Sequence, residues 1–248
     1  MRLDQLIYSQ GFGTRRHCAG LIVAGLVSVE DAVCLDPAAE VLAVSGQTTF
    51  SVQRQSWQFH ERAYVLVNKP AGYECSQRPG AWPSVYSLLP GPLRQRPGGV
   101  KSPGVQAVGR LDQDTTGLLL LSDDGAFIHR MNSPRYHVPK VYEVTVRHPL
   151  AVSQIQRLLD GVVLDDDARP VRAAAAQVVT SRHLQLTLTE GKYHQVKRMV
   201  AAVGNRVNAL HRSQVGPLVL GPDLATGQWR WLTAAEVLAL HEVGRAHR

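Results

Sequence analysis

Hydrophobic residues recur at helical spacing at the start of the chain. Leu3, Leu6 and Ile7 fall on one face of a helix that the segment GFG ends. Thr14 is a suitable N-cap for a second helix, and Gly25 marks the end of that helix. Short strand-like segments follow, with a tight turn at EDA and a last piece at EVLAVSG. Because so few elements enclose only a small core, we predict a small appended module over residues 1–50.

The pattern changes after residue 50. Residues 51–61, SVQRQSWQFHE, are polar and without periodicity, so we predict a linker there. From residue 62 onward, strand-like segments outnumber helices and no regular strand–helix–strand repeat is present. This arrangement predicts an α+β domain over residues 62–248 with a largely antiparallel or mixed sheet. Within it, residues 90–104, PGPLRQRPGGVKSPG, predict an exposed loop because they are rich in proline and glycine.

Several segments of this domain have a clear type. The leucines of GLLLLSDDG and the alternation in KVYEVTVRH predict strands, and HQVKRMVAAVG predicts an amphipathic helix. A final helix is predicted over TAAEVLALHEVG. Its start is marked by Thr233, which is followed three residues later by Glu236 in the pattern of a capping box.

The charge of the chain favours an anionic partner. Its formal net charge is +7 and its pI is about 9.6. Residues 1–50 carry a net −2, residues 51–160 a net +5 and residues 161–248 a net +4. The basic side chains are 22 arginines and 5 lysines, and arginine suits bidentate contact with phosphate. Residue types alone therefore predict a protein that binds nucleic acid.

The composition argues against several other classes of protein. Three cysteines without a CxxC spacing fit neither a disulfide framework nor a structural zinc site, but fit a reducing cytosol. The ten histidines include no i, i+4 pair, and no glycine-rich dinucleotide or phosphate loop is present. The longest aliphatic run, Leu118–Leu121, is far shorter than the roughly 20 residues of a membrane helix. We therefore expect a cytoplasmic protein without a metal, a cofactor or a membrane anchor.

The segment VGRLDQDTTGLLLLSDDG contains two carboxylates that need an explanation. Asp112 and Asp114 precede a buried strand, where short acidic residues commonly cap a turn. This structural role is favoured for Asp114, and the residues alone leave Asp112 undecided. By the same reasoning Lys197 and Arg198 fit a solvated basic helix face, and Tyr142 fits a core position on its strand.

Four motifs in order change this picture. They are VNKPAGYECS, VGRLDQDTTGLLLLSDDG, SPRYHVPKVYEV and EGKYHQVKRMVAAVGNRVNALHR, and they are distributed through the domain that runs from about residue 62 to the end. In this combination the chain resembles the RsuA family of pseudouridine synthases. The resemblance implies a pseudouridine synthase-like catalytic domain, and the first 50 residues resemble the small alpha-L RNA-binding module that accompanies it in the family.

The resemblance assigns roles to named residues. Asp112 corresponds to the essential aspartate, acting either as a nucleophile on the nucleoside or as a base toward the ribose. Lys197 corresponds to the cation that pairs with it, with Arg198 as the fallback, because a nearby opposite charge favours an ionised carboxylate. Tyr142 corresponds to the tyrosine that stacks on the target base. The reaction detaches uracil, rotates it and rejoins it through carbon, so it needs no cofactor and no metal.

Further residues are expected to contact RNA. A base inside an RNA helix has to be turned out of its stack before it reacts, and Arg110 is the candidate to fill the gap. Asn68 and Lys69 of the NKP motif are expected to be structural or to contact RNA, and Arg198 is also expected to bind RNA. Arg15 and Arg16, at the start of the second helix, are expected to supply the phosphate contact of the N-terminal module.

The motif details resemble the small-subunit type of the family, which implies 16S rRNA as substrate and position 516 as the type of target. The expected partner is ribosomal RNA or a pre-ribosomal particle, bound by a monomer. Three alternatives stay open. One is a synthase that acts on 23S rRNA, another is a non-catalytic RNA-binding or ribosome-assembly factor, and the third is a hydrolase that uses Asp112 and Asp114 as a dyad.

Overall fold

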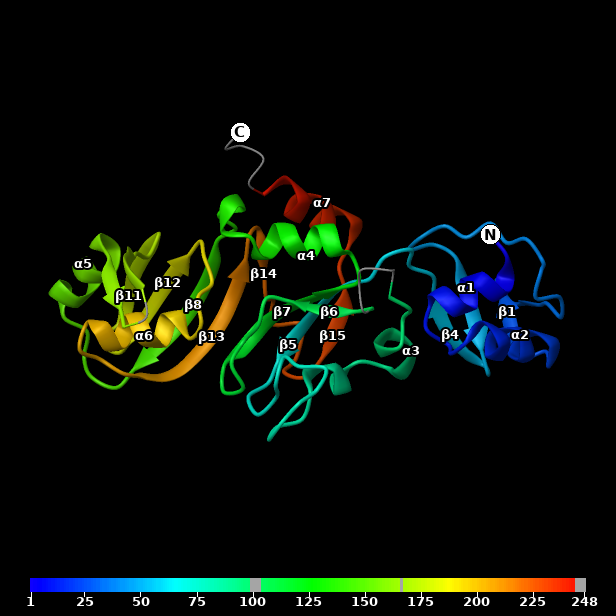
Figure 1. Ribbon diagram of the computed structural model, residues 1–248, viewed down its shortest axis with the longest axis horizontal. Helices are drawn as coiled ribbons and strands as arrows, with labels where there is room; N and C mark the ends of the chain where they lie inside the picture. The colour runs from blue at the N-terminus through cyan, green and yellow to red at the C-terminus, as the bar shows by residue number, and fades with distance from the viewer. Residues whose placement is uncertain (99–103, 166, 244–248) are drawn as a thin grey trace. The chain divides into compact units, whose positions relative to one another are not determined.

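A computed structural model describes residues 1–98, 104–165 and 167–243, in two compact units (Figure 1). One unit combines Met1–Tyr64 with Leu89–Gln106 and Ser122–Gly125, and the other holds the rest. The helices are α1 (Leu3–Ser9), α2 (Arg15–Val23), η1 (Val85–Leu88), α3 (Gly91–Arg94), α4 (Gly125–Asn132), η2 (Pro134–Tyr136), α5 (Val152–Asp160), α6 (Gln195–Ala202) and α7 (Ala234–Glu242). The strands are β1 (Val27–Val29), β2 (Ala32–Val33), β3 (Thr49–Val52), β4 (Gln55–Gln58), β5 (Tyr64–Lys69), β6 (Gln106–Val108), β7 (Thr116–Ser122), β8 (Lys140–Val146), β9 (Val162–Leu164), β10 (Asp167–Val171), β11 (Ala175–Thr180), β12 (His183–Leu188), β13 (Val207–Val215), β14 (Leu218–Val219) and β15 (Trp229–Trp231).

The first unit packs two helices on a four-stranded antiparallel sheet of order β2-β1-β3-β4 (Figure 1). The predicted face of α1 is confirmed, because Leu3, Leu6 and Ile7 are fully buried in its core. The N-cap of α2 is also confirmed, since the hydroxyl of Thr14 accepts a hydrogen bond of 3.2 Å from the backbone nitrogen of His17. EVLAVSG, in contrast, contains no strand of the sheet; its only ladder contact among the described residues is an isolated bridge at Glu40.

Residues 51–61 do not form the predicted linker. They contain the end of β3 and all of β4, which pair in an antiparallel hairpin that belongs to the first unit. Gln53 and Arg54 form its two-residue turn with φ values of 52° and 69°. Both residues therefore adopt the left-handed conformation that tight hairpins require, although neither is a residue type that usually signals such a turn. The polar composition reflects a solvent-facing strand and not a flexible connection.

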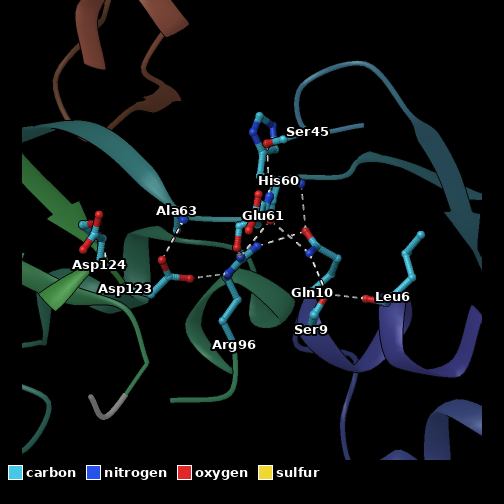
Figure 2. A network of polar contacts seen from close by, with 11 residues as sticks. Leu6, Ser9, Gln10, Ser45, His60, Glu61, Ala63, Arg96, Asp123 and Asp124 are labelled. Carbon is cyan, nitrogen blue, oxygen red and sulfur yellow. Dashed lines mark hydrogen bonds and ion pairs between the residues drawn. The ribbon is translucent and has the colours of Figure 1, made fainter. Parts of the chain in front are cut away.

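A buried arginine, Arg96, is the centre of a network of polar contacts within the first unit (Figure 2). Arg96 pairs with Asp123 at 2.8 Å, and both side chains are at least nine-tenths buried. Its guanidinium also donates to the side chain of Gln10 and to the backbone carbonyls of His60 and Glu61. The segment 90–104 is therefore not simply an exposed loop: it contains the short helix α3 and this buried side chain, while residues 99–103 lie outside the described residues.

The second unit is built on a nine-stranded sheet whose main path is β11-β12-β8-β13-β7-β5-β15, with β6 and β14 attached at its sides. Antiparallel pairs dominate, whereas β13 and β7 run parallel. The predicted α+β class with a mixed sheet is confirmed. Leu118–Leu121 of β7 are at most 1% exposed, which is typical of a strand covered on both faces.

The parallel contact between β7 and β13 depends on a glycine. Gly117 has a φ of +102°, a region that side-chain-bearing residues rarely adopt. A Cβ at this position would clash with the backbone carbonyl of Arg212 on β13. The absence of a side chain thus lets the two strands pair, which brings the loop before β7 close to the residues of β13.

The helices of the second unit flank its sheet (Figure 1). Helix α6 contacts β9 and β13 and buries Val196, Met199 and Val200. The capping box predicted for the last helix is confirmed, since the side chains of Thr233 and Glu236 each bond the other residue's backbone nitrogen. In the part of the chain that the structure describes, no helix has the length and apolar character to cross a bilayer.

Candidate active site

A cleft of about 910 Å³ opens within the second unit. Its walls come from the loop between β6 and β7, from β8 and β13, and from the turn that leads into α6. The cleft has the volume of a small-molecule or nucleotide pocket. Asp112, Tyr142 and Lys197, which the sequence motifs single out, all line it.

Asp112 lies in a turn that a buried lysine holds in place. Lys69 has no exposed surface, and burial lowers the pKa of its ammonium group. Its nitrogen donates at 2.8–3.2 Å to the backbone carbonyls of Pro70, Asp112, Gln113 and Thr115. Because one ammonium group satisfies carbonyls from both sides of the turn, the backbone that carries the Asp112 carboxylate is fixed.

The carboxylate of Asp112 is only one-quarter exposed and contacts two basic side chains. Lys197 places its ammonium nitrogen 2.9 Å from Oδ2, and His194 places Nε2 3.2 Å from Oδ1. Lys197 also lies 2.7 Å from Oδ1 of Asp114. Burial acts to lower the pKa of Lys197, but the hydrogen bonds and charges of Asp114 and Asp112 outweigh it and raise that pKa. Lys197 is therefore held as a cation against the carboxylate.

His194 is the site residue that sequence reasoning missed. No motif assigns it a role, and no other histidine lies at the i, i+4 spacing of a zinc site. The structure shows that it precedes α6 with φ 49° and ψ 32°, a left-handed conformation that costs energy for a residue with a side chain. A usable signal was its spacing from Lys197, since residues three apart at a helix start point the same way.

Tyr142 and Arg212 line the cleft from the sheet. They are directly paired across β8 and β13, so their side chains lie on the same face. Tyr142 is 9% exposed, and Arg212 is buried and donates through Nε to the carbonyl of Leu118 at 2.8 Å. Lys140, two residues before Tyr142, also lines the cleft. Burial, together with the nearby charge of Arg212, lowers the pKa of Lys140 to about 8.

The remaining expected residues differ in their placement. Arg110 is exposed at the cleft. Arg198 does not pair with Asp112: its Nη1 donates to the backbone carbonyl of Tyr193 at 3.3 Å, which leaves Lys197 as the partner. Asn68 is buried and donates to the carbonyl of Leu224 at 2.8 Å. For Asn68 and Lys69 the structure favours the structural alternative over RNA contact, because neither side chain is exposed enough to meet a ligand.

Arg15 and Arg16 are exposed at the start of α2 in the first unit. The guanidinium carbon of Arg15 lies 4.9 Å from the centre of the Tyr8 ring, a cation–π distance. Both arginines remain accessible to an anion. Among the described residues, no group of three or more His, Cys, Asp or Glu side chains is arranged to hold a metal ion.

The comparison with protein families settles what kind of enzyme this geometry belongs to. The family described as RNA pseudouridylate synthase matches residues 63–202, which is more than half of the chain. The chain belongs to this family. It is therefore an RNA pseudouridine synthase, as the motifs imply. A second family, the S4 domain, matches residues 1–43 of the first unit.

Individual relatives agree with this membership. The chain is 38% identical to the ribosomal small subunit pseudouridine synthase A of Escherichia coli strain K12, over 97% of this chain and 100% of that protein. It is 44% identical to the protein of the same name from Yersinia pestis, over 74% of each chain. A solved structure described as pseudouridylate synthase aligns with a TM-score of 0.67 at 32% identity, over 97% of this chain and 99% of the other.

Proposed function

We propose that this enzyme converts uridine to pseudouridine in the 16S rRNA of the small ribosomal subunit, at the position-516 type of target. The relatives named above carry the proposal for the substrate, since both are named as small-subunit synthases and one matches along nearly the whole chain. The observation that carries the chemistry is the contact of 2.9 Å between Lys197 and Asp112 inside the cleft.

The proposed reaction is a balanced isomerisation. The bond between ribose C1′ and uracil N1 breaks, uracil rotates, and a bond forms between C1′ and uracil C5. C5 loses its proton and N1 gains one, so no electron and no external group is transferred. The Asp112 carboxylate assists the first step either as a nucleophile or as a base toward the ribose. Lys197 stabilises the ionised form of the carboxylate before it reacts and again when it is released.

The target uridine enters the cleft after leaving its RNA stack. Tyr142 lines the cleft on its sheet side, and we assign it to stacking on the everted uracil, with its hydroxyl as a candidate for assisting proton transfer. Arg110, exposed at the same cleft, is the candidate to occupy the gap that eversion leaves in the RNA. These roles require both side chains to lie around one everted nucleotide, and both line the same cavity as Asp112.

RNA outside the cleft is proposed to be held by basic side chains. Arg15 and Arg16 are exposed on the S4 unit, where phosphate contact is electrostatic and independent of sequence. Arg198 and Arg110 supply positive charge near the cleft. The net charge of +7 favours the encounter with a ribosomal RNA or a pre-ribosomal particle.

The chemistry is tested with two matched variants. Purified wild-type, Asp112→Asn and Asp114→Asn proteins are incubated with a 16S transcript, and pseudouridine is mapped by carbodiimide modification and primer extension. Wild type is expected to give a single strong stop that Asp112→Asn abolishes, whereas Asp114→Asn keeps most of the activity because its carboxylate only shares Lys197. Equal signals from wild type and Asp112→Asn would refute catalysis by Asp112. Equal losses in both variants would instead show that pseudouridine formation needs both Asp112 and Asp114.

The substrate is tested in cells. Pseudouridines are mapped on both large ribosomal RNAs from cells with and without the gene. Loss of one site in 16S rRNA is expected, with 23S rRNA unchanged. Loss of a site in 23S rRNA would refute the proposed substrate and support the large-subunit alternative, while leaving the enzyme class intact. No loss in either RNA would support a role in assembly without modification.

A further inference from the structure

An aromatic pair stands at the edge of the cleft, and the reaction described above does not use it. The rings of Tyr193 and His194 are stacked, with centroids 3.8 Å apart and planes 20° from parallel. Both residues line the cleft, yet Tyr193 is 68% exposed. One face of the tyrosine ring is covered by the imidazole, so most of its exposed area belongs to the other face.

The pair is braced from behind. His194 Nε2 lies 3.2 Å from Oδ1 of Asp112, so the imidazole contacts the carboxylate through its edge and the tyrosine ring through its face. The buried carboxamide of Gln195 accepts a hydrogen bond from the backbone of Lys192 and donates one to Glu190, both at 2.8 Å. The turn that carries the two rings is thus held by side-chain hydrogen bonds at its base, and its outer ring is presented in one orientation.

We propose that the exposed face of Tyr193 is a stacking site for the nucleobase next to the target uridine. This inference rests on the proposed function. Asp112 contacts an edge nitrogen of the imidazole, and Tyr193 stacks on the face of the same ring, so the histidine and not the tyrosine contacts the reacting carboxylate. Eversion of the target uridine leaves its neighbour without one stacking partner, and an aromatic side chain replaces such a partner in RNA recognition. Stacking on an aromatic ring tolerates any base because every base has a π-face.

A different role for Tyr193 predicts different kinetics. If the ring only supported His194, its removal would loosen the contact with Asp112 and lower kcat at saturating RNA. If it binds a neighbouring base, its removal weakens RNA binding and leaves the reacting groups in place. The split between KM and kcat therefore separates the two roles.

The test uses Tyr193→Ala, Tyr193→Leu and Tyr193→Phe with the rRNA transcript that the wild-type protein modifies. We expect Ala and Leu to raise KM by about 5- to 150-fold, the range for loss of one stacked base, with kcat changed less than about threefold. Tyr193→Phe keeps the ring and is expected to rescue KM. Trp82→Ala is the matched control, since Trp82 is also exposed but does not line the cleft.

A spectroscopic measurement reports the stack directly. 2-Aminopurine, whose fluorescence is quenched by stacking, is placed in turn on each side of the target uridine and bound to Asp112→Asn protein. At one of the two positions, the complex with Asp112→Asn/Tyr193→Ala is expected to be brighter. Unchanged fluorescence at both positions, or a loss of kcat with KM unchanged, would overturn the inference. Because wild-type pseudouridine formation is measured first on the same RNA, either result leaves the proposed function standing.

Discussion

The ammonium nitrogen of Lys197 lies 2.9 Å from Oδ2 of Asp112. Replacing Lys197 with methionine keeps the length of the side chain and removes its charge. We expect kcat to fall about 100- to 1000-fold, as for loss of one preorganised electrostatic contact in a water-poor site. Tritium release from 5-tritiated uridine in the transcript measures this. Should Arg198→Met lose kcat while Lys197→Met retains it, the fallback cation would be the true partner.

Lys69 is predicted to matter for stability more than for RNA binding. Lys69→Met leaves several buried carbonyls short of a donor, and we expect it to lower the free energy of unfolding by about 2–4 kcal/mol. Urea denaturation measures the loss, and the exposed Arg182→Met serves as control with a change within about 0.5 kcal/mol. A folded Lys69→Met protein of normal stability but weakened RNA binding would show that the RNA-contact alternative was right.

The buried pair of Arg96 and Asp123 is predicted to be strongly coupled. Arg96→Met leaves Asp123 buried beside a neutral side chain and is expected to cost about 3–5 kcal/mol. Combining it with Asp123→Asn removes the unpaired charge, so the double variant is expected to be more stable than Arg96→Met alone. A double-mutant cycle in chemical denaturation measures this coupling. Additive losses would mean that the pair contributes through its separate hydrogen bonds only.

We predict that RNA binding in the cleft depends on pH through the charge of Lys140. Because burial, with the charge of Arg212, lowers the pKa of Lys140 to about 8, its ammonium is charged below that pH and neutral above it. RNA affinity is expected to fall roughly fivefold between pH 7 and pH 9, equivalent to about 1 kcal/mol of lost Coulomb attraction. Lys140→Arg, which stays charged, should flatten this step in a filter-binding titration. A step of equal size in Lys140→Arg would assign the titration to another group.

The arginines of the S4 unit are predicted to act through charge alone. Arg15→Glu/Arg16→Glu is expected to weaken binding of the rRNA transcript and to reduce the slope of log K against log salt by about 2, one unit for each lost phosphate contact. Turnover at saturating RNA should be spared, because neither residue lines the cleft. An unchanged affinity and salt slope would remove these residues from the RNA-binding surface.

Local signals explain the parts of the fold that the sequence predicted well. The burial of Leu3, Leu6 and Ile7 follows from their spacing within one helix, and the capping box at Thr233 joins residues three apart. The hairpin over residues 51–61 was missed because its turn residues, Gln53 and Arg54, are not turn formers. Pairing of β3 with β4 imposes their left-handed conformation, and local composition does not indicate that pairing.

The residues of the site also fall into two groups, those that motifs identify and those whose contacts depend on distant partners. The motifs named Asp112, Tyr142 and Lys197, and the structure places all three on one cleft. The motifs did not reveal what Lys69 and His194 contact, because those partners are distant in sequence. Lys69 donates to carbonyls more than 40 residues away. His194, in the turn before α6, contacts Asp112 on a distant segment of the chain. Contacts of this kind depend on tertiary packing. The catalytic roles stay predictions until the variants are measured.

The parallel pairing of β13 with β7 has a consequence for how the enzyme becomes competent. Thr116 and His211, neighbours across these strands, are 95 positions apart in the chain. During synthesis the segment with Asp112 leaves the ribosome well before the segment with Lys197, so a nascent chain carries half of its charge pair and no cleft. Closing so long a loop is entropically costly and slow. A chain that still lacks the segment with Lys197 therefore has no complete cleft, and we expect it not to modify RNA.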